Sequence, residues 1–309
     1  RGSEWPVRSY LTEFRNRAAE HPDGMCDLSI GTPVDPTPEV IRQALSDASD
    51  AHGYPTTAGT AQLREAIASH YRDWYGLDIA PDRIAVTTGS SGAFQTTFLT
   101  CFDVGDRVAL ARLGYGAYKN ILAALGCEVV ELDCGADEGF QPTVELLAAA
   151  HAEAPLKGLM LASPANPTGT MIGPEALGEL VGWCRDNGVQ VISDEIYHGI
   201  SYIGTRGETA LGHDDEAIVI SSFSKYWAMT GWRLGWAILP DGLVEEVLDV
   251  LGREERITIF ATTLDGDLQL HDTLGSGTDL LTLFRRGTTA DLAGRAGDLV
   301  GYARARGDA

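Results

Sequence analysis

The sequence contains very little lysine. Lys119, Lys157 and Lys225 are the only lysines among its 23 basic residues, so arginine carries most of the positive charge. Arginine can replace lysine as a solvated charge, but its guanidinium keeps its proton in proteins and cannot act as a free amine. Lys225, in the stretch SSFSKYWAMTGWRLG 221–235, is therefore a candidate for amine chemistry.

The sequence also lacks paired cysteines and metal-binding patterns. Its five cysteines are scattered and none has CxxC spacing, and the histidines form no metal pattern. The odd number and the spacing of the cysteines favour a reducing cytoplasm over a disulfide framework. His198 is expected to pack or to face solvent rather than to act in catalysis.

Long apolar runs and positive charge are absent as well. No apolar run approaches the roughly 18 residues of a membrane span, and the first residues contain no signal-peptide apolar region. The formal net charge is -21, and the isoelectric point is about 4.6. These features argue against nucleic acid and membrane partners, and a small anionic ligand would need a locally positive site.

From about residue 84, strand-like apolar runs alternate with helix-like segments. This alternation predicts an α/β fold with a mostly parallel sheet, flanking helices and ligand sites at the carboxyl ends of the strands. No GxGxxG or GxxxxGK[ST] motif indicates a nucleotide site. The expected strands are 84–88, 107–111, 127–132, 158–162, 189–194 and 217–222, and the expected helices are 91–101, 116–125, 143–152, 174–187 and 242–251.

Four short stretches follow expected strands: GSSGAF 89–94, SPANPTGT 163–170, SDEIYHGI 193–200 and SSFSKYWAMTGWRLG 221–235. Together, in this order and spacing, they resemble the class I/II aminotransferases, which are pyridoxal-phosphate enzymes of fold type I. The match runs from about residue 27 to about residue 264. Each motif alone is a weak signal, but the four together are a strong one.

The resemblance assigns catalytic roles to Lys225, Asp194 and Tyr197. Lys225 matches the lysine that binds the cofactor aldehyde and then moves the substrate α-proton, and Asp194 matches the carboxylate that pairs with the pyridine nitrogen. Tyr197 and Asn166 match residues that hydrogen-bond the cofactor's phenolic oxygen, and Asn166 also faces the substrate. Without the resemblance, Lys225 would be interpreted as a surface lysine and Asp194 as the N-cap of a helix. Asn166, in NPTG, would be interpreted as part of a turn. Glu195 is expected to be structural.

The resemblance also implies a cup for the cofactor phosphate. Ser90, Ser91 and Gly92 open an expected helix, whose free N–H groups and positive dipole end attract anions. Hydroxyls and a guanidinium complete the cup in the family, and the matching residues here are Ser222, Ser224 and Arg233. Without its context, GSSG would be read as a flexible turn.

Three further matches concern the cofactor ring, the partner subunit and the substrate. Tyr115 matches the aromatic residue that stacks on the pyridine ring. Tyr54 matches a residue that reaches the phosphate of the neighbouring subunit, which implies a homodimer with shared sites. Gly31 matches a glycine near the substrate carboxylate. Pro164 and Pro167 are candidates for cis peptide bonds.

The resemblance weakens near the C-terminus. Family members supply an arginine for the substrate α-carboxylate from an RxSF-like stretch, which this sequence lacks. A truncation, a frameshift or a divergent small domain would each explain the difference. The expected division is an N-terminal arm over 1–45, a large cofactor-binding domain over 46–252 and a remnant of the small domain over 253–309. The tail arginines are Arg285, Arg286, Arg295, Arg304 and Arg306.

The expected function is transfer of an amino group between an amino acid and a 2-oxo acid by a pyridoxal-phosphate aminotransferase. A carbon–sulfur β-lyase is the alternative within enzymes, because the same lysine and electron-accepting ring would serve it. The other alternative is a cofactor-binding remnant with little or no turnover. The missing arginine predicts weak transamination by this chain.

Overall fold

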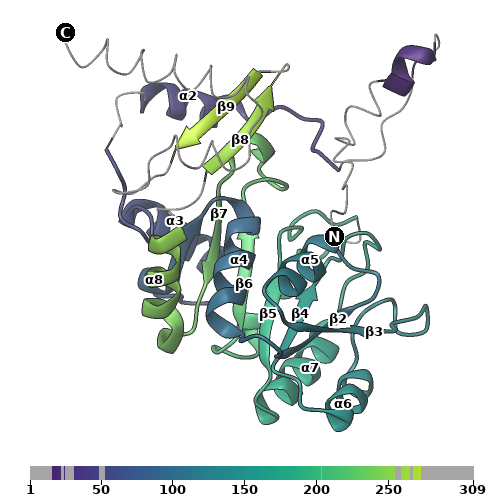
Figure 1. Cartoon of the computed structure of the whole chain (residues 1–309). Helices are drawn as coiled ribbons and strands as arrows, with labels where there is room; N and C mark the ends of the chain where they lie inside the picture. Colours follow the sequence, from purple (N-terminus) through teal and green to yellow (C-terminus); the bar gives the residue numbers. More distant parts are fainter. Residues whose placement is uncertain are drawn as a thin grey trace.

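The computed structural model describes residues 16–21, 24, 31–48, 53–202, 204–254, 259–264 and 267–272. Its centre is a seven-stranded sheet with the order β1-β7-β6-β5-β4-β2-β3 (Figure 1). This arrangement confirms the expected α/β fold with a mostly parallel sheet. The strands are β1 (Ile84–Thr87), β2 (Arg107–Ala111), β3 (Glu128–Leu132), β4 (Gly158–Ala162), β5 (Gln190–Asp194), β6 (Ile218–Ser222) and β7 (Gly235–Ile238).

β7 differs from the other strands of the sheet. It pairs antiparallel with β1 and β6, whereas the other neighbouring strands pair in parallel. The sequence analysis does not include it among the expected strands. β7 has only four residues and is separated by two residues from the end of a short 3₁₀ turn, η3 (Thr230–Trp232), so no long apolar run indicates it.

Helices pack on both faces of the sheet, whereas α2 (Glu39–Asp47) has no buried residue and contributes to neither core (Figure 1). Most agree with the expected ranges to within two or three residues, but α2 and α3 lie in a region to which the sequence analysis assigns no helix. α3 nevertheless carries recognisable ends, because Thr60 caps its N-terminus and Gly76 ends it in a left-handed conformation. The helices are α2 (Glu39–Asp47), α3 (Ala61–Tyr75), α4 (Gly89–Cys101), α5 (Gly116–Ala124), α6 (Val144–Glu153), α7 (Pro174–Asp186) and α8 (Val244–Glu254).

Alternate residues of the central strands supply two separate apolar cores. On β4, Leu159 and Leu161 belong to the core under α3, α6 and α7, whereas Met160 belongs to the core under α4, α5 and α8. Successive side chains of a strand point to opposite faces, so a strand buried on both faces is apolar throughout. The continuous apolar runs in the sequence have this origin.

The direction of the strands brings the sequence motifs to one edge of the sheet. β1, β2, β4, β5 and β6 run in the same direction, so their carboxyl ends lie at the same edge. Because β7 runs the opposite way, its first residue also lies at this edge. The loops after β1, β2, β4, β5 and β6 and the loop before β7 therefore surround one region.

The expected domain boundaries stay predictions. α2 extends across residue 45, so the boundary proposed there falls within a helix. Past α8, the structure describes a hairpin of β8 (Ile259–Leu264) and β9 (Asp267–Asp272). The five tail arginines lie outside the described residues.

Candidate active site

A small cavity of about 170 Å³ lies at the carboxyl edge of the sheet. Nine of the residues predicted from sequence line it, and they come from segments after β1, β2, β4, β5 and β6. Tyr118, Ile196 and Thr230 line it as well, although the sequence analysis does not select them. The nine are Ser90, Ser91, Tyr115, Asn166, Asp194, Tyr197, Ser224, Lys225 and Arg233.

One end of the cavity is positively charged. Ser90 and Ser91 lie in the first turn of α4, where backbone N–H groups have no partner within the helix. The Arg233 guanidinium packs directly over Gly89, where an added Cβ would lie 2.6 Å from Nη2. Among the described residues, no carboxylate lies within ion-pair distance of Arg233. In a chain of net charge -21, this is the locally positive site that an anion needs.

Lys225 lies beside this positive end, just after β6. Its Nζ donates a hydrogen bond to the Gly31 carbonyl at 2.5 Å and lies 5.9 Å from the centre of the Tyr197 ring. Burial, and next the charge of Arg233, lower the pKa of the Lys225 amine from its ordinary value. A lowered pKa makes the neutral, nucleophilic amine more available.

Asp194, at the last position of β5, supplies a carboxylate to the lining of the cavity. It is buried, and each carboxylate oxygen has a donor: Oδ1 accepts from the Ile196 backbone N–H at 3.0 Å, and Oδ2 accepts from the Tyr118 hydroxyl. Burial raises the pKa of Asp194 to about 6, and the two hydrogen bonds oppose this increase. A cationic ring nitrogen next to Asp194 would favour the ionised form.

Tyr118 is the main residue that the sequence analysis misses. It lies three residues after Tyr115, at the start of α5, so both rings lie on the same side of the helix, with centroids 5.4 Å apart. The signal was the spacing in GYGAY, where a second tyrosine follows one helical turn after the first.

Tyr197 and Asn166 meet across the cavity from the loops after β5 and β4. The Asn166 amide lies near the Tyr197 hydroxyl. Burial, followed by the charges of Asp194 and Tyr115, raises the pKa of Tyr197 against the lowering effect of Asn166, so its hydroxyl keeps its proton.

The peptide bonds before Pro164 and Pro167 are both cis. A second, larger cavity of about 800 Å³ borders the site at Asn166 and Tyr197.

Four of the predicted site residues do not line the small cavity. Ser222 is fully buried, and its hydroxyl accepts a hydrogen bond from the Ser224 backbone N–H at 3.2 Å. Gly92 is buried in the first turn of α4, where a Cβ would lie 2.5 Å from the Thr88 hydroxyl. The Gly31 carbonyl contacts Lys225, and Tyr54 is 99% exposed. Their roles toward a ligand stay predictions.

The described residues contain no group of three or more His, Cys, Asp or Glu side chains placed to hold a metal ion. None of their helices combines the length and the apolar character needed to cross a membrane.

Comparison with known proteins identifies the family. The sequence matches the family described as aminotransferase class I and II over residues 23–265. The chain belongs to this family. A valine–pyruvate aminotransferase from Mycobacterium tuberculosis is 48% identical over 227 residues, covering 72% of this chain and 58% of the relative. The transaminase OxyQ from Streptomyces rimosus, which acts on 4-dedimethylamino-4-oxo-anhydrotetracycline, is 33% identical over 80% of this chain and 66% of its own length.

Solved structures of aminotransferases have the same fold. A crystal structure of an aminotransferase from Mycobacterium tuberculosis matches with a TM-score of 0.70 and 48% identity, over 73% of this chain and 62% of that one. An aspartate aminotransferase from Thermus thermophilus, solved with maleate, matches with a TM-score of 0.70 and 30% identity, over 73% of this chain and 59% of that one. The chain thus spans less than two thirds of the length of these relatives.

Proposed function

We propose that this aminotransferase-family chain binds pyridoxal phosphate at the small cavity and transfers an amino group between an amino acid and a 2-oxo acid. The observation that carries the proposal is the set of groups that line one cavity. They are the first turn of α4, the Arg233 guanidinium, the Asp194 carboxylate and the Lys225 amine.

The residues present fit this cofactor. The N-terminus of α4 and Arg233 would hold the phosphate, because backbone N–H groups and a guanidinium both bind phosphate oxygens well. Asp194 would face the pyridine nitrogen, and Tyr115 would lie against the ring. Lys225 is the one lysine on the cavity, so it would hold the aldehyde.

Pyridoxal phosphate supplies an aldehyde that condenses with amines and a ring that accepts the electrons of the broken Cα–H bond. Lys225 then has two tasks, which are to hold the aldehyde before substrate arrives and to move the α-proton afterwards. Asp194 holds the proton on the pyridine nitrogen, which makes the ring a better electron acceptor. The Tyr197 hydroxyl, which lines the cavity next to Asn166, would donate to the phenolic oxygen.

The substrates proposed are a small aliphatic amino acid such as valine, with pyruvate as the acceptor. The support is the 48% identity with the valine–pyruvate aminotransferase of Mycobacterium tuberculosis. The β-lyase alternative and the inactive remnant have no comparable support.

A homodimer with shared sites is part of the proposal. The almost complete exposure of Tyr54 supports it, because a side chain that contacts a second copy projects from its own subunit. Sedimentation of the cofactor-loaded protein should show a dimer, and a fully loaded monomer would contradict this.

The scattered cysteines support a cytoplasmic location; Cys101, Cys127, Cys134 and Cys184 are free thiols.

The test begins with the absorbance spectrum of the purified protein with pyridoxal phosphate, before and after L-valine is added. Slow conversion of bound cofactor to pyridoxamine phosphate, reversed by pyruvate, is the expected result, because this sequence lacks the RxSF-like stretch and the arginine expected from it. A cofactor that binds but does not respond to valine or to other amino acids would contradict the transfer function. Release of pyruvate and ammonia from a cysteine conjugate would favour the β-lyase.

A further inference from the structure

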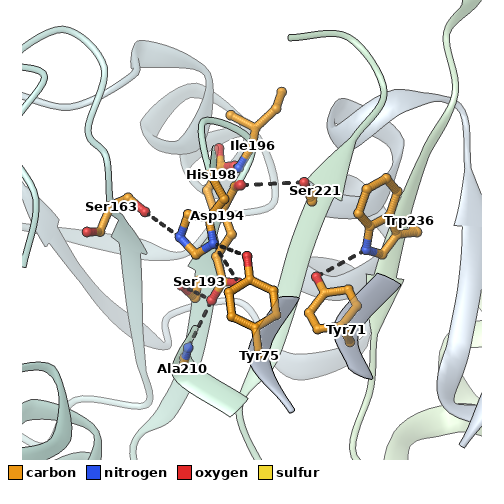
Figure 2. Close-up of polar contacts among 11 residues, drawn as sticks. Tyr71, Tyr75, Ser163, Ser193, Asp194, Ile196, His198, Ala210, Ser221 and Trp236 are labelled. Carbon is orange, nitrogen blue, oxygen red and sulfur yellow. Dashed lines mark hydrogen bonds and ion pairs between the residues drawn. The ribbon is translucent and has the colours of Figure 1, made fainter. Parts of the chain in front are cut away.

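Behind the cofactor cavity lies a buried polar cluster that the proposed reaction does not use. It consists of Glu195 together with His198, Tyr75 and the Ser163 carbonyl. His198, Tyr75 and Ser163 are labelled in Figure 2. The side chains of Glu195 and His198 are only 2% and 5% exposed. Two titratable groups buried this deeply next to a reaction site need a physical explanation.

Glu195 has one satisfied carboxylate oxygen and one bare one. Oε1 accepts hydrogen bonds from the Ser193 hydroxyl at 3.1 Å and from the Ala210 backbone N–H at 2.9 Å. Oε2 is buried and has no hydrogen-bond partner among the described residues, and His198 Nδ1 lies 3.6 Å away. A buried carboxylate with a bare oxygen is costly, whereas a protonated carboxyl group is not charged.

His198 has a partner for each ring nitrogen. Nε2 lies 2.9 Å from the Ser163 carbonyl, which can only accept, so Nε2 carries a proton. Nδ1 lies 2.6 Å from the Tyr75 hydroxyl, which can donate to it when the ring is neutral. Gly207 packs against this ring, because an added Cβ there would lie 2.5 Å from Cδ2. The neutral imidazole therefore has both of its hydrogen bonds.

The cluster is connected to the residues that would touch the cofactor. Glu195 directly follows Asp194, and the His198 backbone N–H donates to the Glu195 carbonyl at 3.0 Å, which closes the turn that carries Tyr197. Ser163 begins the loop that carries Asn166. Tyr75 is the last residue of α3. The cluster thus joins α3 to the two loops that place Asp194, Tyr197 and Asn166.

We propose that Glu195 and His198 are a positioning pair, in which Glu195 holds a proton and His198 is neutral, so that Asp194 is the only negative charge at the end of β5. This inference rests on the proposed function, because it assigns the pair a role toward the cofactor. An ionised Glu195 would add a second carboxylate next to Asp194 and would weaken the tie between α3 and the loops.

The charges around the pair are consistent with this state. Burial raises the pKa of Glu195 from 4.5 to about 8, against the opposing effects of Ala210, Thr209 and Ser193, and Asp194 adds a smaller increase. The Thr209 hydroxyl, although near, makes no hydrogen bond among the described residues. Burial lowers the pKa of His198 from 6.5 to about 4, and His70 adds to the decrease. Tyr71 and Tyr75 also lie near the pair, and burial raises the pKa of both tyrosines. Arg206 lowers the pKa of Tyr75 and Glu208 raises it.

The pair has a measurable effect on stability without any cofactor. Between about pH 4.5 and about pH 8 the native protein keeps the Glu195 proton while the unfolded chain loses it, so stability falls as the pH rises. His198 acts in the opposite sense, because the unfolded chain takes up a proton below about pH 6.5 and the native protein does so only near pH 4.

The test compares urea unfolding of the cofactor-free wild type with Glu195→Gln at several pH values. Gln cannot ionise, so the ratio of the two unfolding constants should change by roughly a hundredfold between about pH 5.5 and about pH 7.5, the wild type weakening as the pH rises. Glu216→Gln, which removes an exposed carboxylate, is the control and should show no such change.

Infrared difference spectroscopy provides a second readout. A protonated-carboxyl band present at neutral pH in the wild type should be missing in Glu195→Gln and present in Glu216→Gln. A constant ratio of unfolding constants, or no such band, would overturn the inference. Attachment of pyridoxal phosphate to Lys225 is measured separately, so failure of the proposed function would not be confused with failure of this inference.

Discussion

The two sides of the β5 end contain adjacent carboxylates in different surroundings. Asp194 faces the cavity, and both of its oxygens accept hydrogen bonds. Glu195 belongs to the buried cluster, and one of its oxygens has no donor among the described residues. Burial raises both pKa values, to about 6 for Asp194 and to about 8 for Glu195.

The difference shows how the placement of donors affects a buried acid. Each acid accepts two hydrogen bonds, but those of Asp194 are divided between its two oxygens, whereas both of those to Glu195 reach Oε1 and leave Oε2 without a donor among the described residues. A bare buried oxygen favours the protonated form, so Glu195 keeps its proton while Asp194 can pair with a cation. The strand itself separates the two roles, because successive side chains leave it on opposite faces. The following predictions test this division between the cavity side and the buried side.

The largest effect is expected for Lys225→Ala, which removes the one amine on the cavity side. Covalent attachment of pyridoxal phosphate should be lost completely, together with turnover, because arginine and the other groups there cannot condense with an aldehyde. Borohydride reduction followed by peptide mapping measures the attachment. Lys119→Ala is the control, since Lys119 pairs with Glu131 on the surface, and labelling of another lysine would show that the assignment is wrong.

The next effect is expected for Asp194→Asn. An amide cannot hold a proton on the pyridine nitrogen by charge, so turnover should fall by roughly a hundredfold or more while the cofactor stays attached. Glu195→Gln is the matched variant on the buried side and should change turnover at neutral pH by less than about threefold, since Gln resembles the protonated acid. Equal losses in the two variants would remove the distinction between the sides.

A smaller effect is expected for Arg233→Lys, which keeps the charge but loses the planar fork. The affinity for pyridoxal phosphate should fall by about ten- to a hundredfold, corresponding to about 1.5–3 kcal/mol for a charged hydrogen bond. Equilibrium titration measures it. Arg112→Lys is the control, because Arg112 pairs with Asp133 away from the cavity, and unchanged affinity in Arg233→Lys would place the phosphate elsewhere.

The residues that line the cavity could be predicted from the sequence far better than those of the buried cluster. Lys225, Asp194 and Arg233 lie in motifs next to strand ends, and a parallel sheet brings such ends together without further information. Arg233 lies just before β7, and the antiparallel direction of β7 places it at that edge. Nothing in the sequence of this four-residue strand indicates its direction.

The cluster of Glu195, His198 and Tyr75 depends on where α3 packs, and tertiary contacts rather than local pattern decide this. His198 was expected to pack or to face solvent, and the structure buries it. Tyr118 differs from the residues of this cluster, because the sequence shows its spacing of one helical turn from Tyr115. That spacing could have predicted that Tyr118 lies beside the cavity.

The smallest effect is expected for Tyr118→Phe, which removes one of the two donors to Asp194. A neutral hydrogen bond contributes about 0.5–1.5 kcal/mol, so turnover should fall by roughly two- to tenfold, far less than in Asp194→Asn. In the cofactor-free protein the pKa of Asp194 should rise further above its ordinary value. Since a raised acid pKa makes stability fall as the pH rises toward that value, the fall should extend above about pH 6 in the variant.

Urea unfolding against pH measures this shift, with Tyr115→Phe as the control, because the Tyr115 ring lines the same cavity while the Asp194 hydrogen bond comes from Tyr118. If Tyr118→Phe makes Asp194 titrate lower instead, the hydroxyl is not donating to the carboxylate. The division of donors between the two oxygens would then fail to explain why the two neighbouring acids differ. If the shift occurs as expected, loss of the donor to Oδ2 leaves Asp194 with one bare oxygen, as Glu195 has at Oε2, and raises its pKa in the same direction.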